Sequence, residues 1–352
     1  MKRSPQTGKI QTVLGAIAPR DLGITLTHEH VMCDCGCYFQ VPEEASLRAL
    51  INAPVTMDIL GILPGVWAYN HDNQKLWDVK AAIEELSAFR HAGGGSLVDT
   101  SNIGLARDPL ALARISRATG LNIIMGASHY VPVSYPPDMD KRSEDAIAEN
   151  IVRDLTVGVG DTAVKCGIIG EVGNFWPVTP NQNKVLRASA RAQRETGAAI
   201  LIHPGFFPDS PPAILDILDK GGADISRVIM GHLDLFADRA IIAGLVKAGC
   251  YMEYDVFGME TTAIGQQVHP SIYLQSDVQR MEMLEFIISK GGGERIVVAQ
   301  DTFFKWQMSR YGGKGYAHIL ENIVPRMRKR GFTEQQIHAI LVDNPRRILT
   351  FA

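Results

Sequence analysis

Short apolar runs alternate with amphipathic stretches along most of this chain. The apolar runs are rich in β-branched residues and predict eight strands, which begin near residues 24, 96, 121, 167, 198, 227, 250 and 295. Amphipathic patterns with helical spacing lie between them, for example at 78–93, 108–120, 183–197, 238–249 and 280–293. Most of these patterns end in glycine, which favours the end of a helix.

Strands that alternate with helices predict a parallel sheet, and eight such strands close into a (β/α)₈ TIM barrel. An open doubly wound sheet is the alternative. It would require a glycine-rich phosphate loop after the first strand, where the sequence reads THEHVM. No linker or charge block divides the chain, so we expect one barrel domain over residues 1–352, with residues 1–22 as an N-terminal hairpin extension. Two long connections, 31–77 and about 256–278, are candidates for lids or substrate walls.

Composition and charge narrow the range of partners. With 46% hydrophobic and 21% charged residues, the chain has the composition of a globular protein with a substantial core. Lysine and arginine number 35 against 38 aspartates and glutamates, and no basic run stands out, so we expect no nucleic-acid partner. No apolar run resembles a signal peptide or a membrane span, so we expect a cytoplasmic protein with a small-molecule substrate and no membrane partner. The oligomeric state stays open, with a homodimer as one candidate.

The first predicted strand ends in a pair of histidines. Side chains alternate along a strand, so His28 and His30 point to one side and Glu29 to the other. A lone pair of this kind is weak evidence, but four more residues of metal-binding type end later strands: Glu171, His203, His232 and Asp301. Taken singly, each would be read as a core residue or a helix cap. Because barrels of this type keep their active sites at the C-terminal ends of the strands, we expect all six to meet there.

Four imidazoles and two carboxylates suit zinc, manganese, iron or cobalt better than magnesium. The number of ligands fits two divalent ions, and zinc is the metal that we expect first. One ion would bind His28, His30 and Asp301. The other would bind His203 and His232, with Glu171 as the bridge.

This arrangement along the chain resembles the phosphotriesterase family of the amidohydrolase superfamily. The strings QTVLG, TLTHEH, KCGIIGEVG, LIHPG, GCYMEYDVFG, YGGKGYAHIL and DNPRRILTF resemble most closely its phosphotriesterase-related subgroup, whose vertebrate member hydrolyses N-acetyltaurine. The resemblance covers nearly the whole chain. It implies a metal-dependent hydrolase that uses a hydroxide held between two metal ions.

The bridging ligand departs from the pattern of many phosphotriesterases and lactonases, which use a carboxylated lysine on the fourth strand. The motif GEVG of this chain resembles the members that use glutamate, which places the bridge at Glu171. Lys165 lies six residues upstream, and we interpret it as structural; its carboxylation is the alternative.

Three of the five cysteines follow the first strand closely. Cys33, Cys35 and Cys37 lack the second cysteine pair or histidine cluster of a tetrahedral zinc site. We interpret them as small thiols that shape a pocket, with a reactive thiol as the alternative. Cys166 and Cys250 lie at strand starts and are interpreted as packing residues.

Candidate catalytic residues come from the same strand ends. Asp301 is the expected base that takes the proton of the attacking water and passes it to the leaving group. The subgroup carries a tyrosine at Tyr130, which would either hydrogen-bond the substrate carbonyl or be satisfied locally. Asp255 would orient a substrate or a ligand histidine, or cap a helix. For Arg107, a salt bridge is favoured over substrate binding.

Cationic and aromatic residues in the predicted catalytic-face loops are candidates for substrate binding. Lys305 and Arg310 follow the eighth strand and would bind an anionic tail, or else be solvated surface charges. Several aromatic residues would wall an acyl pocket or pack loops together: Trp176, Phe206, Phe207, Phe257 and Trp306.

We therefore expect hydrolysis of a small amide, such as an N-acyl amino acid or N-acyl amino sulfonate. Hydrolysis of a lactone, a carboxylic ester or a phosphotriester is the alternative, because the same hydroxide attacks all of these centres. A ligand-binding protein that has lost catalysis is a third possibility. The complete set of six metal-binding side chains argues against it.

Overall fold

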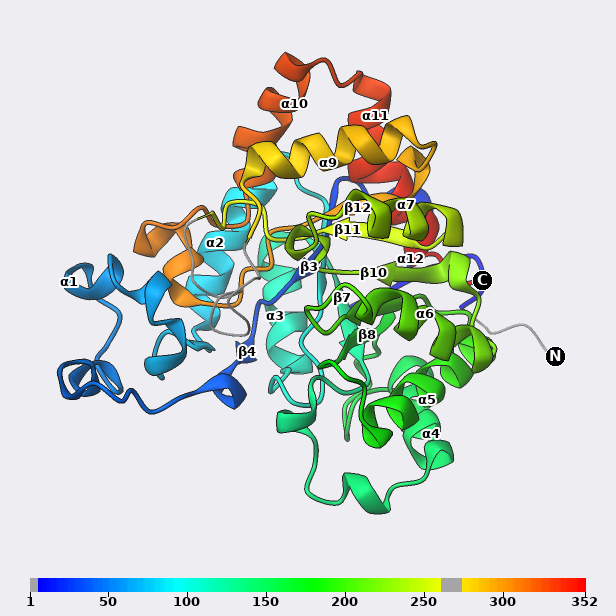
Figure 1. Cartoon of the computed structure of the whole chain (residues 1–352), viewed down its shortest axis with the longest axis horizontal. Helices are drawn as coiled ribbons and strands as arrows, with labels where there is room; N and C mark the ends of the chain where they lie inside the picture. The colour runs from blue at the N-terminus through cyan, green and yellow to red at the C-terminus, as the bar shows by residue number, and fades with distance from the viewer. Residues whose placement is uncertain (1–5, 261–273) are drawn as a thin grey trace.

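Eight parallel strands form the centre of the computed structural model, which describes residues 6–260 and 274–352 (Figure 1). In sheet order they run β12-β11-β10-β9-β8-β7-β6-β3. Their bounds, in chain order, are β3 (Thr25–Glu29), β6 (Ser96–Asp99), β7 (Asn122–Ala127), β8 (Ile168–Gly173), β9 (Ile200–His203), β10 (Val228–Met230), β11 (Tyr251–Tyr254) and β12 (Ile296–Val298). The two edge strands also meet, because the Asp301 N–H donates to the His28 carbonyl at 3.2 Å. The predicted barrel is confirmed.

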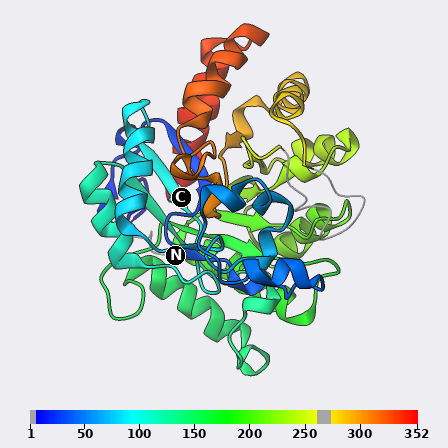
Figure 2. The ribbon, with the colours of Figure 1, turned by 90° about the vertical axis from the view of Figure 1, so that its left-hand side faces the viewer.

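Helices separate successive strands and pack around the barrel (Figures 1 and 2). They are α2 (Val79–His91), α3 (Pro109–Thr119), α4 (Glu144–Thr156), α5 (Pro180–Thr196), α6 (Ser210–Lys220), α7 (Arg239–Ala248) and α9 (Asp277–Ser289). Asp78 and Asp108 cap the first turns of α2 and α3 with their carboxylates. Helices α3, α5 and α7 end at glycines with a left-handed backbone, as the sequence pattern predicts.

One end of the barrel is closed by the two ends of the chain. Strands β1 (Ile10–Thr12) and β2 (Gly15–Ile17) pair antiparallel, and the Phe351 N–H donates to the Lys9 carbonyl at 2.9 Å. Beyond β12 the chain forms α10 (Val324–Arg330), α11 (Glu334–His338) and α12 (Asn344–Leu349). Side chains from β1 and α12 join the apolar cluster of the barrel interior: Ile10, Val98, Ile124, Ile168, Leu201, Ile229, Val297 and Ile348. The opposite end is therefore the one that remains for a site.

The connection 31–77 lies over that opposite end, in blue in Figure 2. It contains α1 (Met57–Leu60) and several short 3-10 turns. Its two ends pair as β4 (Cys33–Asp34) and β5 (Lys75–Leu76), an antiparallel pair that fixes where the connection leaves and rejoins the barrel. The second long connection, about 256–278, is described only up to residue 260 and from residue 274; the remainder lies outside the described residues.

A buried arginine holds the described ends of this second connection. The Arg280 guanidinium is fully buried and donates to Asp234 at 2.6 Å, to Asp277 at 2.8 Å and to the Met259 carbonyl at 2.9 Å. Burial raises the pKa of Asp234 to about 7, while Arg280 opposes that shift. Losing the cation would leave buried carboxylates unpaired, a change that typically costs about 3–5 kcal/mol of folding stability.

Within the described residues, no helix has the length and apolarity needed to cross a membrane.

Candidate metal centre

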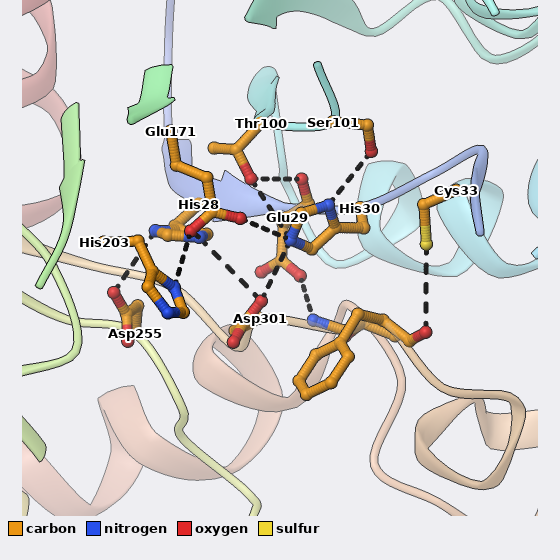
Figure 3. Close-up of polar contacts among 12 residues, drawn as sticks. His28, Glu29, His30, Cys33, Thr100, Ser101, Glu171, His203, Asp255 and Asp301 are labelled. Carbon is orange, nitrogen blue, oxygen red and sulfur yellow. Dashed lines mark hydrogen bonds and ion pairs between the residues drawn. The ribbon is translucent and has the colours of Figure 1, made fainter. Parts of the chain in front are cut away.

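The strand ends bring the six predicted ligands into one buried cluster. Figure 3 labels five of them: His28, His30, Glu171, His203 and Asp301. The six come from five of the barrel strands or from the residues just after them: His28 and His30 at β3, Glu171 in β8, His203 in β9, His232 after β10 and Asp301 after β12. Each of these side chains is at most 9% exposed. The sheet thus gathers residues that lie up to 273 positions apart (301 − 28).

Glu171 lies at the centre of the cluster. Its Oε1 is 3.2 Å from His30 Nε2, and its Oε2 is 3.1 Å from His203 Nδ1. The same Oε2 is 3.4 Å from the Nε2 atoms of His28 and His232. Both carboxylate oxygens therefore reach histidines, which is the geometry that a bridging ligand needs.

The potential ligand atoms fall into groups of three. One group is His28, His30 and Asp301, and another is Glu171, His203 and His232, with the atoms of each group within 4.8 Å of one another. The sequence predicts His28, His30 and Asp301 as ligands of one ion and His203 and His232 as ligands of the other, with Glu171 between them. A third group, formed by His28, His232 and Asp255, lies on the Nδ1 side of the two histidines.

Two buried atoms of the cluster fit the presence of a cation. His28 Nε2 and Asp301 Oδ1 have no hydrogen-bond partner among the described residues. Buried polar atoms are nearly always satisfied, and an atom left without a partner costs about 1–3 kcal/mol. A metal ion bound by these two atoms would satisfy both.

Outer polar groups orient the histidine rings. His28 Nδ1 lies 2.9 Å from Glu253 and 3.2 Å from Asp255, and His232 Nδ1 lies 2.9 Å from Asp255. His30 Nδ1 lies 3.0 Å from the Ser101 hydroxyl. With the Nδ1 atoms held from outside, the Nε2 atoms turn toward Glu171, as metal-ligating histidines usually require. Asp255 therefore orients two histidines and does not cap a helix.

The cluster is strongly coupled electrostatically. Burial lowers the pKa of His28, but the charges of Glu171, Asp255 and Glu253 outweigh it and raise that pKa well above its usual value. Burial likewise opposes the shift at His232, where Asp255 raises the pKa to about 10. The pKa of Glu171 is lowered well below its usual value by the histidines, against burial. The buried carboxylates thus stabilise positive charge among the histidines. Protons and metal ions would compete for the same histidine nitrogens.

Asp301 and His232 both have a left-handed backbone, with φ of 47° and 52°. Such a conformation is rare for residues other than glycine and persists where surrounding contacts enforce it. The His232 N–H donates to Asp255 at 2.8 Å, and the Asp301 N–H donates to the His28 carbonyl. The backbone is thereby bent to aim both side chains into the cluster.

Tyr130 is in the wall beside the cluster. Its hydroxyl is 3.5 Å from His203 Nδ1 and accepts a hydrogen bond of 2.9 Å from the Tyr38 hydroxyl. Burial raises the pKa of Tyr130 well above its usual value, so the phenol stays neutral and keeps its proton. Its placement allows the role predicted for it, while Tyr38 is a partner that the sequence did not reveal.

A small cavity of about 60 Å³ opens above the ligands. The walls are mostly apolar or aromatic: Tyr38, Trp67, Leu105, Tyr130, Phe206, Leu235, Val256, Met259, Leu274 and Phe303. Cys35 also lines it, with its sulfur 4.0 Å from that of Cys33, which agrees with a pocket-shaping role for the thiol. Among the lining residues that the structure describes there is no lysine or arginine.

The predicted cationic residues lie outside this cavity. Lys305 Nζ is 2.6 Å from the Asp72 carboxylate, and its backbone N–H donates to the Asn73 carbonyl. Arg310 lies 3.8 Å from Glu84 and over the ring of Tyr311. The loop after β12 packs on the 31–77 connection, so both charges pair with acidic groups of neighbouring elements. The structure does not bring Lys305 and Arg310 to the ligands.

The predicted aromatic residues are divided between cavity and core. Phe206 lines the small cavity, whereas Trp176 does not. Phe257 is 2% exposed, stacks near the Arg280 guanidinium at 5.7 Å, and lines a neighbouring cavity of about 510 Å³ together with Trp306. Trp176 and Phe257 are therefore not brought together with the ligands.

Two further residues are placed away from the cluster. Lys165 precedes β8, at the opposite end of the strand from the ligand side chains, and is half-buried. The structure therefore does not support a carboxylated Lys165 as the bridge. Arg107 forms a buried ion pair with Asp154 of α4 and donates to the Gly126 carbonyl at 2.7 Å. The salt-bridge interpretation of Arg107 is the one that the structure bears out.

Comparison with known proteins settles the family. The model of the phosphotriesterase family matches residues 8–349. The chain belongs to the phosphotriesterase family. The N-acetyltaurine hydrolase of Tetraodon nigroviridis is 40% identical to this family member over 347 residues, which cover 98% of this chain and 99% of that protein. The phosphotriesterase-related protein of Nematostella vectensis is 41% identical, with 98% and 99% covered.

Among solved structures, a resiniferatoxin-binding protein from Rhodobacter sphaeroides is similar to this phosphotriesterase-family chain over its whole length. The TM-score is 0.94 at 34% identity, with 99% of this chain and 97% of that one covered. The predictions of the family and of a metal-dependent hydrolase are confirmed.

Proposed function

We propose that this phosphotriesterase-family member hydrolyses the amide bond of a small N-acyl amino acid or N-acyl amino sulfonate at a centre of two metal ions. The observation that carries this proposal is the arrangement of the six buried side chains in two groups of three. Glu171 belongs to one group, and its carboxylate also reaches His30 of the other. The relatives named N-acetyltaurine hydrolase favour an amide as the scissile bond.

The residues that would hold the ions are His28, His30 and Asp301 for one and His203 and His232 for the other, with Glu171 shared. Zinc is the expected metal, and manganese, cobalt or iron would suit the same nitrogen and oxygen donors. Bound there, two divalent ions would supply a nucleophilic hydroxide at neutral pH and polarise the scissile carbonyl.

The side chains of this chain would move the protons. The Asp301 carboxylate, which lies 3.3 Å from His30 Nε2, would accept the proton of the attacking water and deliver it to the leaving nitrogen. The neutral Tyr130 hydroxyl would donate to the carbonyl oxygen as negative charge develops there. Asp255 and Glu253 would keep the histidine rings in position during turnover.

One observation favours a second candidate function. The small cavity is apolar and has no cationic lining residue among those described, which also suits a neutral lactone, carboxylic ester or phosphotriester. Metal-loaded protein should be tested with N-acetyltaurine, N-acetyl amino acids, lactones and phosphotriesters in parallel. Amide turnover well above that of the other classes supports the proposal, and a lactone as the best substrate would replace it with the second candidate.

The purified protein should contain close to two divalent ions per chain, because six ligands exceed what one catalytic ion with an open position requires. Elemental analysis beside a protein concentration measurement provides the count. Full activity with a single tightly bound ion, and no response to added metal, would contradict this expectation.

Neutralising Lys305 or Arg310 should leave substrate selectivity unchanged, because both cations pair with surface carboxylates outside the cavity. Lys305→Met and Arg310→Met remove exposed or half-buried ion pairs, which typically contribute about 0–1 kcal/mol to stability. Relative KM values for an anionic N-acyl substrate and its neutral analogue would check this. If either variant loses the preference for the anionic substrate, the substituted residue would again be assigned to substrate binding.

A further inference from the structure

A second cavity adjoins the metal-ligand cavity. It has a volume of about 510 Å³, against about 60 Å³ for the cavity above the ligands. Met259 lines both of them, so its side chain stands where they meet. Gln300 and Thr302, the neighbours of Asp301 on either side, also line the larger cavity. The two cavities therefore lie on either side of Met259, close to Asp301.

The larger cavity carries a cation that the smaller one lacks. Lys314 is its one basic lining residue in the described part of the chain, and no ion pair or hydrogen bond of its ammonium group is found there. This distinguishes Lys314 from Lys305 and Arg310, which have carboxylate partners. The side chain of Lys314 is exposed, and without a described carboxylate partner its ammonium group is available to a ligand anion.

The stem of Lys314 lies close to the backbone of Gly258. Gly258 has φ of +90°, and a Cβ built on it would lie 3.0 Å from Lys314 Cγ and 3.1 Å from Lys314 Cβ. The lysine stem thus occupies the space that any larger residue at position 258 would need. The Gly258 N–H in turn donates to Asp277 at 2.8 Å, which ties this contact to the start of α9.

Other polar groups of the larger cavity are mostly engaged. Gln300 donates to the Gly315 carbonyl, and Gln307 donates to the Asp301 carbonyl at 2.8 Å. Glu260, the one carboxylate among the described lining residues, accepts from the Asp277 N–H at 2.8 Å. The indole Nε1 of Trp306, another lining residue, has no hydrogen-bond partner among the described residues. Among the described lining residues, the Lys314 ammonium group and the Trp306 indole are thus donors without a described partner, and both can bind an anionic ligand.

We infer that the larger cavity binds the acidic half of the substrate, with the Lys314 ammonium group pairing with a carboxylate or sulfonate, while the small apolar cavity takes a short acyl group. This inference rests on the proposed amide hydrolysis and adds to it the residue that would select acidic substrates with a short acyl group. Lys314 is here a substrate-binding residue and has no part in the bond-breaking step.

The test compares Lys314→Met with a matched control, Lys329→Met, an exposed lysine of α10 with no ion pair among the described residues. KM and kcat are measured for N-acetyltaurine and for its neutral counterpart N-ethylacetamide, with metal-loaded protein. Lys314→Met should raise KM for N-acetyltaurine at least tenfold and leave kcat within about twofold, because the lost contact lies away from the reacting atoms. For N-ethylacetamide, KM and kcat of Lys314→Met should match those of the wild type. For Lys329→Met, KM and kcat should match the wild type with both substrates.

A binding measurement separates the failure of this inference from the failure of the proposed function. Propanesulfonate, which has no bond to hydrolyse, should bind metal-loaded wild type and lose most of that affinity in Lys314→Met. If amides are hydrolysed but Lys314→Met behaves as wild type in both assays, the assignment of Lys314 is overturned and the function stands. If no amide is hydrolysed but the sulfonate still binds through Lys314, the anion site stands and the amide function is overturned.

Discussion

Glu171→Ala should lose metal and activity together. Glu171 is the side chain whose two oxygens reach histidines of both groups of three, so its removal opens both sites at once. Activity should fall more than about 100-fold, since losing even an outer residue behind a metal ligand typically costs 10–100-fold. Metal content and turnover, measured on the same preparation, provide the check, with circular dichroism to establish that the barrel is intact.

Lys165→Ala is the matched control for this prediction. Lys165 precedes β8 at the far end of the strand and should be replaceable with metal content and turnover preserved. The reverse result, in which Lys165→Ala lacks metal and Glu171→Ala retains it, would assign the bridging role to a carboxylated Lys165.

Asp301→Asn should reduce turnover by about 100-fold or more while changing substrate binding little. The amide keeps the size of the side chain and an oxygen that faces His28 and His30, but it cannot accept the proton assigned to the carboxylate. Because Asp301 is also a proposed ligand, kcat is compared only between preparations with equal metal content. Near-normal kcat at full occupancy would show that another group takes the proton.

The barrel and the positions of the predicted ligands could be predicted because both follow from the order of the strands and helices along the chain. Alternation of apolar runs with amphipathic stretches gives the order of the elements, and parallel strands align their C-terminal ends. Residues such as His203 and Glu171 therefore meet although nothing in their own neighbourhoods indicates the contact. The same reasoning would have found Glu253 in β11, which lies two residues before Asp255 and so points to the same side of the extended chain.

The substrate-binding residues were harder to predict because loops obey no comparable periodicity. Lys305 follows β12 at the expected end of the barrel, yet it pairs with Asp72, which lies 233 positions away in the 31–77 connection. Which charge of one loop meets which charge of another depends on the path of both backbones. The helices between residues 319 and 349, α10, α11 and α12, were not among the predicted elements; they are short and are interrupted by wider turns.

The contacts of Arg280 have a consequence for how new specificities can arise. One guanidinium fixes Met259 on the near side of the second long connection, Asp277 on the far side and Asp234 beneath, where Asp234 accepts from the backbone of Asp255. Substitutions, insertions or deletions in the sequence between positions 260 and 274 thus begin and end at anchored points. Natural or laboratory evolution can therefore change the sequence of this connection while the anchored residues on either side of it, and the histidine scaffold, are inherited intact.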